Sequence, residues 1–150
     1  MESRLDTIDR EIVSQLQEDG RRPYTHIART VGLSEAAVRQ RVQRLIDSGV
    51  VQVVAVTDPL SLGYVRQAMI QMKVDGDVRV VAQRVGEIDA VIYVIITAGA
   101  MDLMCEVVAE SDEELLHLVN DQIRGIPGVR STETTIYLSC EKQTYRWGTR

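Results

Sequence analysis

The sequence predicts an α+β protein with an amino-terminal helix-turn-helix and a carboxy-terminal ferredoxin-like βαββαβ domain. Two observations lead to this prediction. Apolar residues recur at helical spacing through the first 49 residues, and β-branched runs alternate with two capped helical segments beyond them. The chain has 150 residues, of which 26% are charged and 45% hydrophobic. These values suit a globular protein of two small domains.

The first two helices are predicted from their apolar stripes and their ends. Residues 7–17 place four apolar side chains on one stripe, and Asp6 or Thr7 can cap the start of this helix. A second helix begins at Pro23, because proline suits a first helical turn, and ends at Gly32.

A tight turn and a third helix follow. Gly32 tolerates a left-handed backbone, and the Ser34 hydroxyl can cap a helix over 35–47. Two short helices joined by such a turn, the second basic on its outer face, form a helix-turn-helix. The buried stripe of the third helix is predicted to consist of Val38, Val42 and Leu45.

Charge is unevenly distributed along the chain. The net charge of -5 and the pI near 5.1 argue against nucleic acid if the charge is evenly spread. Residues 20–46, however, hold six arginines and one acidic residue, a local charge of +5. Such a reversal marks a candidate phosphate-binding surface, although charge alone also fits a solvated basic face.

The outer face of the third helix carries side chains that can read base edges. With Val38 at the centre of the buried stripe, the residues that point directly away from the core are Ala36, Gln40, Gln43 and Asp47, and arginines flank them. The small alanine permits close approach, and the glutamines suit adenine edges. The helix start and the start of the preceding helix suit backbone phosphates. The predicted DNA contacts are Arg22, Tyr24, Thr25, Ser34, Ala36, Arg39, Gln40, Arg41, Gln43 and Arg44.

After residue 49 the pattern changes to strands. The nearly all-β-branched run 50–56 predicts a strand that leads into a hinge. The remaining predicted elements are strand 65–74, helix 77–86, strand 90–97, strand 102–109, helix 111–124 and strand 129–139. The predicted divisions are a helix-turn-helix domain over 1–49, a strand and hinge linker over 50–63, a ferredoxin-like domain over 64–141, and a tail over 142–150.

One face of the predicted sheet needs a cover. Its outward residues are predicted to be Ile70, Met72, Val94, Ile96 and Met104, which are too apolar for water. A homodimer formed sheet to sheet would bury them at about 1.5 to 3 kcal/mol each. Such a dimer would also present two recognition helices to a palindromic operator in double-stranded DNA.

Short motifs occur in both halves of the chain. In the amino-terminal half they are Leu5-Asp6-Thr7-Ile8-Asp9, Leu16-Gln17-Glu18-Asp19-Gly20-Arg21, Val31-Gly32-Leu33-Ser34, Val38 with Arg41-Val42 and Leu45, and Gly49-Val50. Downstream they are Leu62-Gly63-Tyr64, Gly99 with Asp102, and Ile126-Pro127-Gly128-Val129 with Thr132, Thr134 and Thr135. In this order and spacing the motifs resemble those of the Lrp/AsnC (feast/famine) family of transcription regulators. The resemblance implies a winged helix-turn-helix and a ferredoxin-like effector-binding and oligomerisation domain over 64–141, which dimerises and commonly assembles to an octamer. It also implies control by an amino acid bound between dimers.

The resemblance implies that the effector lies against the turn 98–102. Glycine lets backbone amides approach a ligand carboxylate, and the Asp102 carboxylate can accept from an α-ammonium. The same stretch also fits an ordinary hairpin. Ala100-Met101 departs from the polar and aromatic residues of the family, so the pocket should be more apolar or have lost its ligand. The predicted effector contacts are Gly99, Ala100, Met101, Asp102, Thr132 and Thr134.

The linker departs from the family as well. Val53-Val54 stands where members usually show Gly-Tyr, and no charged residue occurs between Asp47 and Asp58. Phosphate contacts from a wing are therefore doubtful. The single tryptophan, Trp147, is predicted to pack on a neighbouring subunit.

Three functions fit these observations. The first is a sequence-specific DNA-binding regulator that responds to an amino-acid-like effector. The second is an architectural DNA-binding protein without a ligand. The third, an enzyme or metabolite-binding oligomer, is weak because His26 and His117 lie in different predicted helices without an acid or nucleophile partner. We expect no enzyme activity, catalytic residue, cofactor or metal.

The cysteines and the first residues of the chain indicate the cellular compartment. Cys105 and Cys140 are predicted to be buried strand residues, because neither CxxC spacing nor a histidine cluster accompanies them. No apolar run reaches the ~20 residues of a membrane span, and the start is too charged for a signal peptide. The expected location is the cytoplasm, with no membrane partner.

Overall fold

The computed structural model describes residues 5–145 and 148–149. The chain divides into two compact units. One unit contains Met1–Val56 and Lys142–Arg150, and the other contains Thr57–Glu141. Trp147, predicted to pack on another subunit, lies outside the described residues.

The amino-terminal unit is built on three helices, α1 (Thr7–Glu18), α2 (Tyr24–Val31) and α3 (Glu35–Asp47). Asp6 caps α1 by accepting the Asp9 N–H at 2.7 Å. Ser34 caps α3 in the same way, its Oγ accepting the Ala37 N–H at 3.2 Å. Gly32 ends α2 with a φ of 69°, the left-handed conformation predicted for it. The core of this unit consists of Ile12, Val13, Leu16, Ile27, Ala28, Val38, Val42 and Leu45.

The strand predicted over 50–56 is not formed. The N–H groups of Val50 and Val51 bond to the Leu45 carbonyl instead, and Val51 packs against the helical core. Beyond Val51 the chain has no regular structure up to Thr57. A β-branched run forms a strand only beside a partner strand, and none lies next to it among the described residues. The prediction of a strand over 50–56 was therefore wrong.

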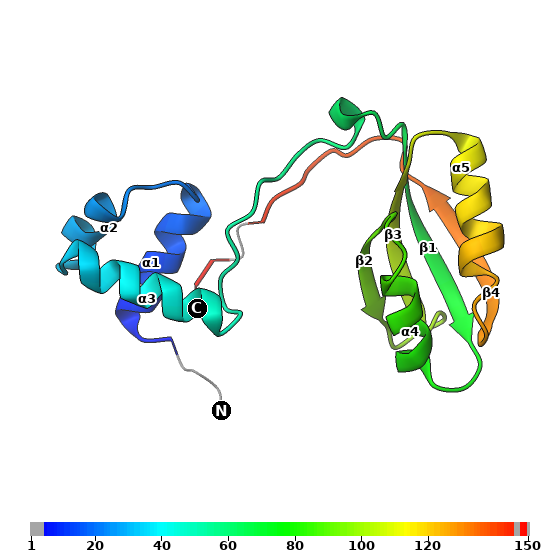
Figure 1. Cartoon of the computed structure of the whole chain (residues 1–150), viewed down its shortest axis with the longest axis horizontal. Helices are drawn as coiled ribbons and strands as arrows, with labels where there is room; N and C mark the ends of the chain where they lie inside the picture. The colour runs from blue at the N-terminus through cyan, green and yellow to red at the C-terminus, as the bar shows by residue number, and fades with distance from the viewer. Residues whose placement is uncertain (1–4, 146–147, 150) are drawn as a thin grey trace. The chain divides into compact units, whose positions relative to one another are not determined.

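The carboxy-terminal unit has the ferredoxin-like topology. Its elements are β1 (Arg66–Val74), α4 (Val78–Gly86), β2 (Val91–Ile96), β3 (Leu103–Ala109), α5 (Asp112–His117) with a π-helical continuation (Leu118–Ile123), and β4 (Val129–Ile136). A short 3-10 turn (Leu60–Leu62) precedes them. The strands form one antiparallel sheet in the order β2-β3-β1-β4, and both helices cover one face of it (Figure 1). The predicted fold class is confirmed.

The two faces of the sheet were assigned wrongly. Ile70 and Met72 are fully buried beneath the helices, and Val94 packs against the same core. Ile96 pairs with the buried Leu103, although its side chain is about half exposed. Of the predicted outward residues, only Met104 lies on the open face. The strand register places Met69, Gln71, Tyr93, Ile95, Met104 and Glu106 on that face.

The two cysteines have different environments. Cys105 lies in β3 and is fully buried, and this burial raises the pKa of its thiol to about 12. Cys140 is exposed and lies beyond the end of β4. The prediction of a buried strand residue was therefore wrong for Cys140, because β4 ends at Ile136 and Cys140 follows it in an exposed segment.

Candidate DNA-binding surface and effector site

The outer face of α3 is exposed as the helical spacing predicts. Val38, Val42 and Leu45 are buried in the unit core. The side chains on the opposite side are open to solvent, and Ser34 at the helix start is exposed as well. The exposed residues of this face are Ala36, Arg39, Gln40, Gln43, Arg44 and Asp47.

Arg39 is held at the edge of this face by two neighbours. Its Nη2 donates to Glu35 Oε1 at 2.8 Å, one turn earlier on α3. Its guanidinium also lies 5.3 Å from the centroid of the Tyr24 ring at the start of α2. The side chain is 65% exposed, so it can still reach a ligand. Tyr24, predicted as a phosphate contact, thus supports an arginine.

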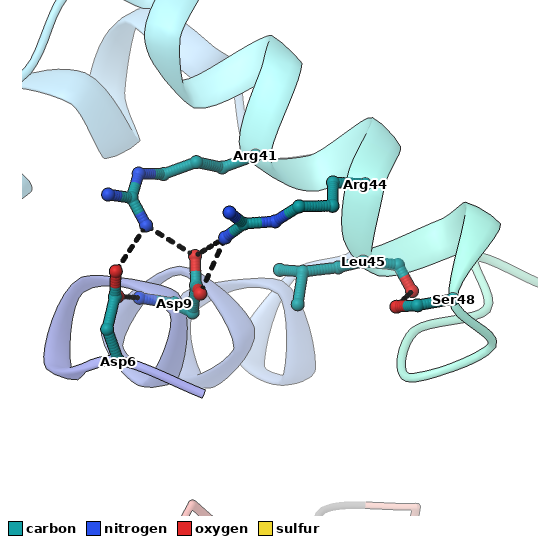
Figure 2. A network of polar contacts seen from close by, with 6 residues as sticks. All are labelled: Asp6, Asp9, Arg41, Arg44, Leu45 and Ser48. Carbon is teal, nitrogen blue, oxygen red and sulfur yellow. Dashed lines mark hydrogen bonds and ion pairs between the residues drawn. The ribbon is translucent and has the colours of Figure 1, made fainter. Parts of the chain in front are cut away.

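Arg41 and Arg44 converge on acidic residues of α1 (Figure 2). Nη1 of Arg41 lies 2.7 Å from both Asp6 Oδ2 and Asp9 Oδ1. Nη2 of Arg44 bonds to both oxygens of Asp9, at 2.9 Å and 2.7 Å. The Asp9 side chain is only 5% exposed, whereas that of Arg44 is 57% exposed. We define these four residues as the α1–α3 ion-pair network.

The network also determines where the guanidinium of Arg41, one of the predicted DNA contacts, lies. Because its guanidinium reaches the start of α1 and is 25% exposed, it lies beside the helix junction rather than on the outer face. The N–H of Asp9, which caps against Asp6, and then the Arg41 guanidinium lower the pKa of the Asp6 carboxyl. The same carboxylates raise the pKa of Arg41.

Most of the local positive charge is paired within the unit. Arg22 bonds to Glu18 at 3.1 Å and to Gln15 at 3.4 Å, and Gln43 bonds to Asp47 at 2.8 Å. Four of the six arginines counted between residues 20 and 46 are therefore in ion pairs, three with acids of α1 or its cap that lie outside that window. Among the described residues, Arg21 and Arg29 are the exposed arginines of that window without an ion pair.

Asp9 is the residue of this site that the sequence prediction missed. Asp6 and Asp9 both belong to a motif that resembles the family, and Asp6 is also a predicted helix cap, but helical spacing assigns neither of them a partner on the third helix. A signal was present, since Asp9 lies on the same helical stripe as Ile12, Val13 and Leu16. An acidic residue on a buried stripe requires a basic partner.

The predicted effector turn connects β2 to β3. Thr97 closes it, because its N–H bonds to the Asp102 carbonyl at 2.9 Å and its Oγ1 to the Met101 carbonyl at 2.7 Å. The Asp102 carboxylate accepts the Val74 N–H at 3.0 Å and Lys73 Nζ at 3.3 Å. The Val74 N–H is the main cause of the lowered pKa of Asp102. Asp102 therefore ties the turn to the end of β1, a structural role that the sequence did not reveal.

The other predicted effector residues lie near this end of the sheet. Gly99 and Ala100 are exposed, and Met101 is half-buried. Thr132 pairs with Met72 and Thr134 with Ile70, so both threonines share the side of the sheet that carries the helices. Two surface hollows of this unit, of about 570 Å³ and about 490 Å³, lie elsewhere, along α5 and beside Tyr64.

Comparison with known proteins defines the class. An exposed recognition helix joined to a ferredoxin-like unit is the architecture of a DNA-binding transcriptional regulator with a ligand-binding domain. Residues 5–46 match the AsnC-type helix-turn-helix domain, and residues 67–147 match the Lrp/AsnC ligand binding domain. The chain belongs to the Lrp/AsnC family, which consists of DNA-binding regulators and not of enzymes.

Similar proteins carry matching names. An uncharacterized HTH-type transcriptional regulator of Pyrococcus furiosus is 38% identical over 143 residues, covering 94% of this chain and 97% of the relative. The leucine response regulatory protein of Mycobacterium tuberculosis superposes with a TM-score of 0.84 at 31% identity, covering 93% of this chain and 96% of that one. A Neisseria meningitidis regulator, solved as an L-Met complex, gives a TM-score of 0.81 at 26% identity and 94% coverage of both chains.

Among the described residues, the structure contains no helix with both the length and the apolar character needed to cross a bilayer.

Proposed function

We propose that the protein binds a specific, palindromic DNA operator through α3 and that an amino-acid effector modulates this binding. The observation that carries the proposal is the exposed outer face of α3. Gln40 and Gln43 lie there next to Arg39 and Arg44, and the small, exposed Ala36 in the first turn of the helix permits a close approach. Glutamine amides suit adenine edges and guanidinium groups suit guanine or phosphate. Operator binding of this kind would take place in the cytoplasm.

The phosphate contacts are proposed to surround this face. Ser34 and the first amides of α3 offer N–H groups to one phosphate, and Thr25 at the start of α2 is exposed for another. Arg22 is half-buried, and its Nη1 and Nη2 bond to Gln15 and Glu18, which leaves less of its guanidinium for a phosphate. Because four arginines are already paired with acids, non-specific affinity should be modest. That expectation favours a specific regulator over an architectural protein.

The effector is proposed to bind at the turn 98–102, next to a second dimer. Gly99 has no positive φ, and among the described residues no atom beyond its two chain neighbours lies within 4 Å of a Cβ added to it. The fold of the single chain therefore does not require glycine there. A close approach by a ligand carboxylate would require it. The Asp102 carboxylate is 36% exposed and keeps lone pairs that can accept from an α-ammonium. The exposed Ala100 favours an apolar amino acid.

A homodimer formed through the open face of the sheet is proposed to join two recognition helices. The register places four large apolar side chains there, and the Tyr93 side chain is 56% exposed. Burying these side chains against a second copy of the chain is favourable. Further assembly of the dimers to an octamer would bring two dimers together at the effector turns. The apolar residues of this face are Met69, Tyr93, Ile95 and Met104.

One experiment tests the regulator function. The DNA upstream of the protein's own gene is titrated in a gel shift with each proteinogenic amino acid, at low and high salt. We expect the wild-type protein to bind this DNA specifically and one apolar amino acid to change that binding. The double variant Arg39→Ala/Gln40→Ala should lose specific binding. The Gly99→Val variant should bind DNA but no longer respond to the amino acid. Full operator affinity in the double variant would refute the assignment of α3. Binding that ignores every amino acid and falls steeply with salt would support an architectural protein.

A further inference from the structure

The α1–α3 ion-pair network places a buried carboxylate directly behind the proposed DNA-reading face. Both oxygens of Asp9 accept from arginines of α3, and the side chain is 5% exposed. Arg41 follows Asp9 by 32 residues in the chain, and Arg44 follows it by 35. The network therefore fixes α1 and α3 to one another from outside the apolar core (Figure 2).

The two arginines occupy different positions in the network. Arg41 is 25% exposed, and its Nη1 donates to two carboxylates. Arg44 is 57% exposed, and only its Nη2 is bonded to Asp9. A guanidinium carries five N–H donors in a rigid plane, so Arg44 keeps Nη1 and Nε for another acceptor.

We propose that Asp9 is a positioning residue for DNA recognition, which holds the Arg44 guanidinium at the edge of the α3 outer face so that its remaining donors meet a DNA phosphate or guanine. Arg41, in contrast, contacts no DNA and serves only to fix α3 against α1. This inference rests on the proposed DNA binding by α3.

The physical reason is the side-chain entropy of arginine. A free arginine on a helix samples many rotamers, and ordering it in a complex costs about 0.5 to 1.5 kcal/mol. The Asp9 contact orders the guanidinium before DNA arrives, because the charge-assisted bonds hold its plane from one side. A held guanidinium improves specific contacts that require one geometry. Non-specific phosphate binding tolerates many geometries and gains little.

The test compares specific with non-specific binding in the full-length protein. The specific probe is the duplex that wild-type protein enriches from a random-sequence library, and the non-specific probe is poly(dI-dC). The variants are Asp9→Asn, Arg44→Gln, Arg41→Gln and the Asp9→Asn/Arg44→Gln double variant. Glu11→Gln is the matched control, because it makes the same charge change on α1 at a residue that bonds to Gln15 rather than to α3.

We expect Asp9→Asn to weaken binding to the enriched duplex by roughly tenfold while its affinity for poly(dI-dC) does not fall. The same substitution should add little in the Arg44→Gln background, because Asp9 acts through Arg44. Arg44→Gln should reduce the salt slope of log K by about 0.9, and Arg41→Gln should leave that slope unchanged. If Asp9 had a purely structural role, Asp9→Asn would lower the affinity for both probes together, and equal losses on both probes would therefore overturn the inference. It would also be overturned if the losses of the two single variants simply added in the double variant.

A second variant covers the case in which Asp9→Asn does not fold. Arg44→Lys keeps the charge but loses the planar fork, so it should retain the poly(dI-dC) affinity and lose roughly tenfold on the enriched duplex. Wild-type affinity for both probes in this variant would overturn the inference. A wild-type protein that enriches no duplex over poly(dI-dC) would instead contradict the proposed DNA binding, so the two failures are distinguishable.

Discussion

Gly32 shows how one residue sets the geometry of the helix-turn-helix. It ends α2 with a φ of 69°, and its N–H bonds to the Ala28 carbonyl. Among the described residues, no atom beyond Gly32 and its two chain neighbours lies within 4 Å of a Cβ built on it. The requirement for glycine is therefore conformational and not steric.

Replacing Gly32 with alanine should lower the free energy of unfolding of the helical unit by about 1 kcal/mol, because an L-residue is strained in the left-handed region. Gly32→Asn should cost less, since asparagine tolerates that region. Urea unfolding followed by circular dichroism measures both. Gly99→Ala is the matched control, because Gly99 has no positive φ and open space around it. An equal loss in the control would contradict the conformational explanation.

Between elements, the cap of α1 also joins α1 to α3. Asp6 accepts the Asp9 N–H and the Arg41 guanidinium, and both contacts lower its pKa below the ordinary 3.8. A carboxyl whose pKa is lowered by folding stabilises the native state above its unfolded pKa. That contribution is lost as the pH falls through the folded pKa.

Asp6→Asn keeps a cap acceptor but removes the charge. We expect the variant to be less stable than wild type at about pH 7, and this difference to shrink as the pH falls below about 3.8. Thermal unfolding of both proteins across that range measures it. Because other carboxyls such as Asp112 also titrate there, only the difference between the two proteins is informative. A difference that stays constant with pH would show that the Asp6 charge does not stabilise the fold.

The elements differ in how far the sequence predicts them. Helix boundaries follow closely, because the caps at Asp6, Ser34 and Ser111 are local signals. The face of the sheet on which each strand residue lies does not follow from the sequence, because β1 carries apolar residues at both odd and even positions. Met69 competes with Ile70, and a shift of one residue exchanges the faces.

The site was predicted in the same uneven way. Helical spacing identifies the outer face of α3, since exposure depends only on the buried stripe. The ion pairs of Arg41 could not be predicted in this way, because its partners, Asp6 and Asp9, lie more than 30 residues earlier in the chain. Neither charge counting nor periodicity within one helix can show a contact between helices.

At the scale of the whole molecule, the distribution of charge acquires a different meaning. Residues 20–46 carry a net +5 in the sequence, yet acids of α1 and its cap pair with Arg22, Arg41 and Arg44 in the folded unit. The unit therefore presents few unpaired arginines to DNA. Binding strength should then depend on joining two units, each of them weak alone.

The open face of the sheet is where that joining is expected. Met104 is the second residue of β3, an inner strand of the sheet, and it pairs with Ile95 on one side and Gln71 on the other. Met104→Glu would place a charge inside the dimer interface, so the dimer dissociation constant should rise on the order of 100-fold. Sedimentation velocity over a concentration series measures this rise.

Operator affinity should fall with the loss of the dimer, since a monomer presents one recognition helix to a two-part site. The Met104→Leu variant keeps the volume and the apolar character of the interface, so it should sediment and bind DNA as wild type does. A Met104→Glu protein that remains dimeric would show that the sheet face is not the interface. A monomeric protein with full operator affinity would show that DNA recognition does not need two joined helices.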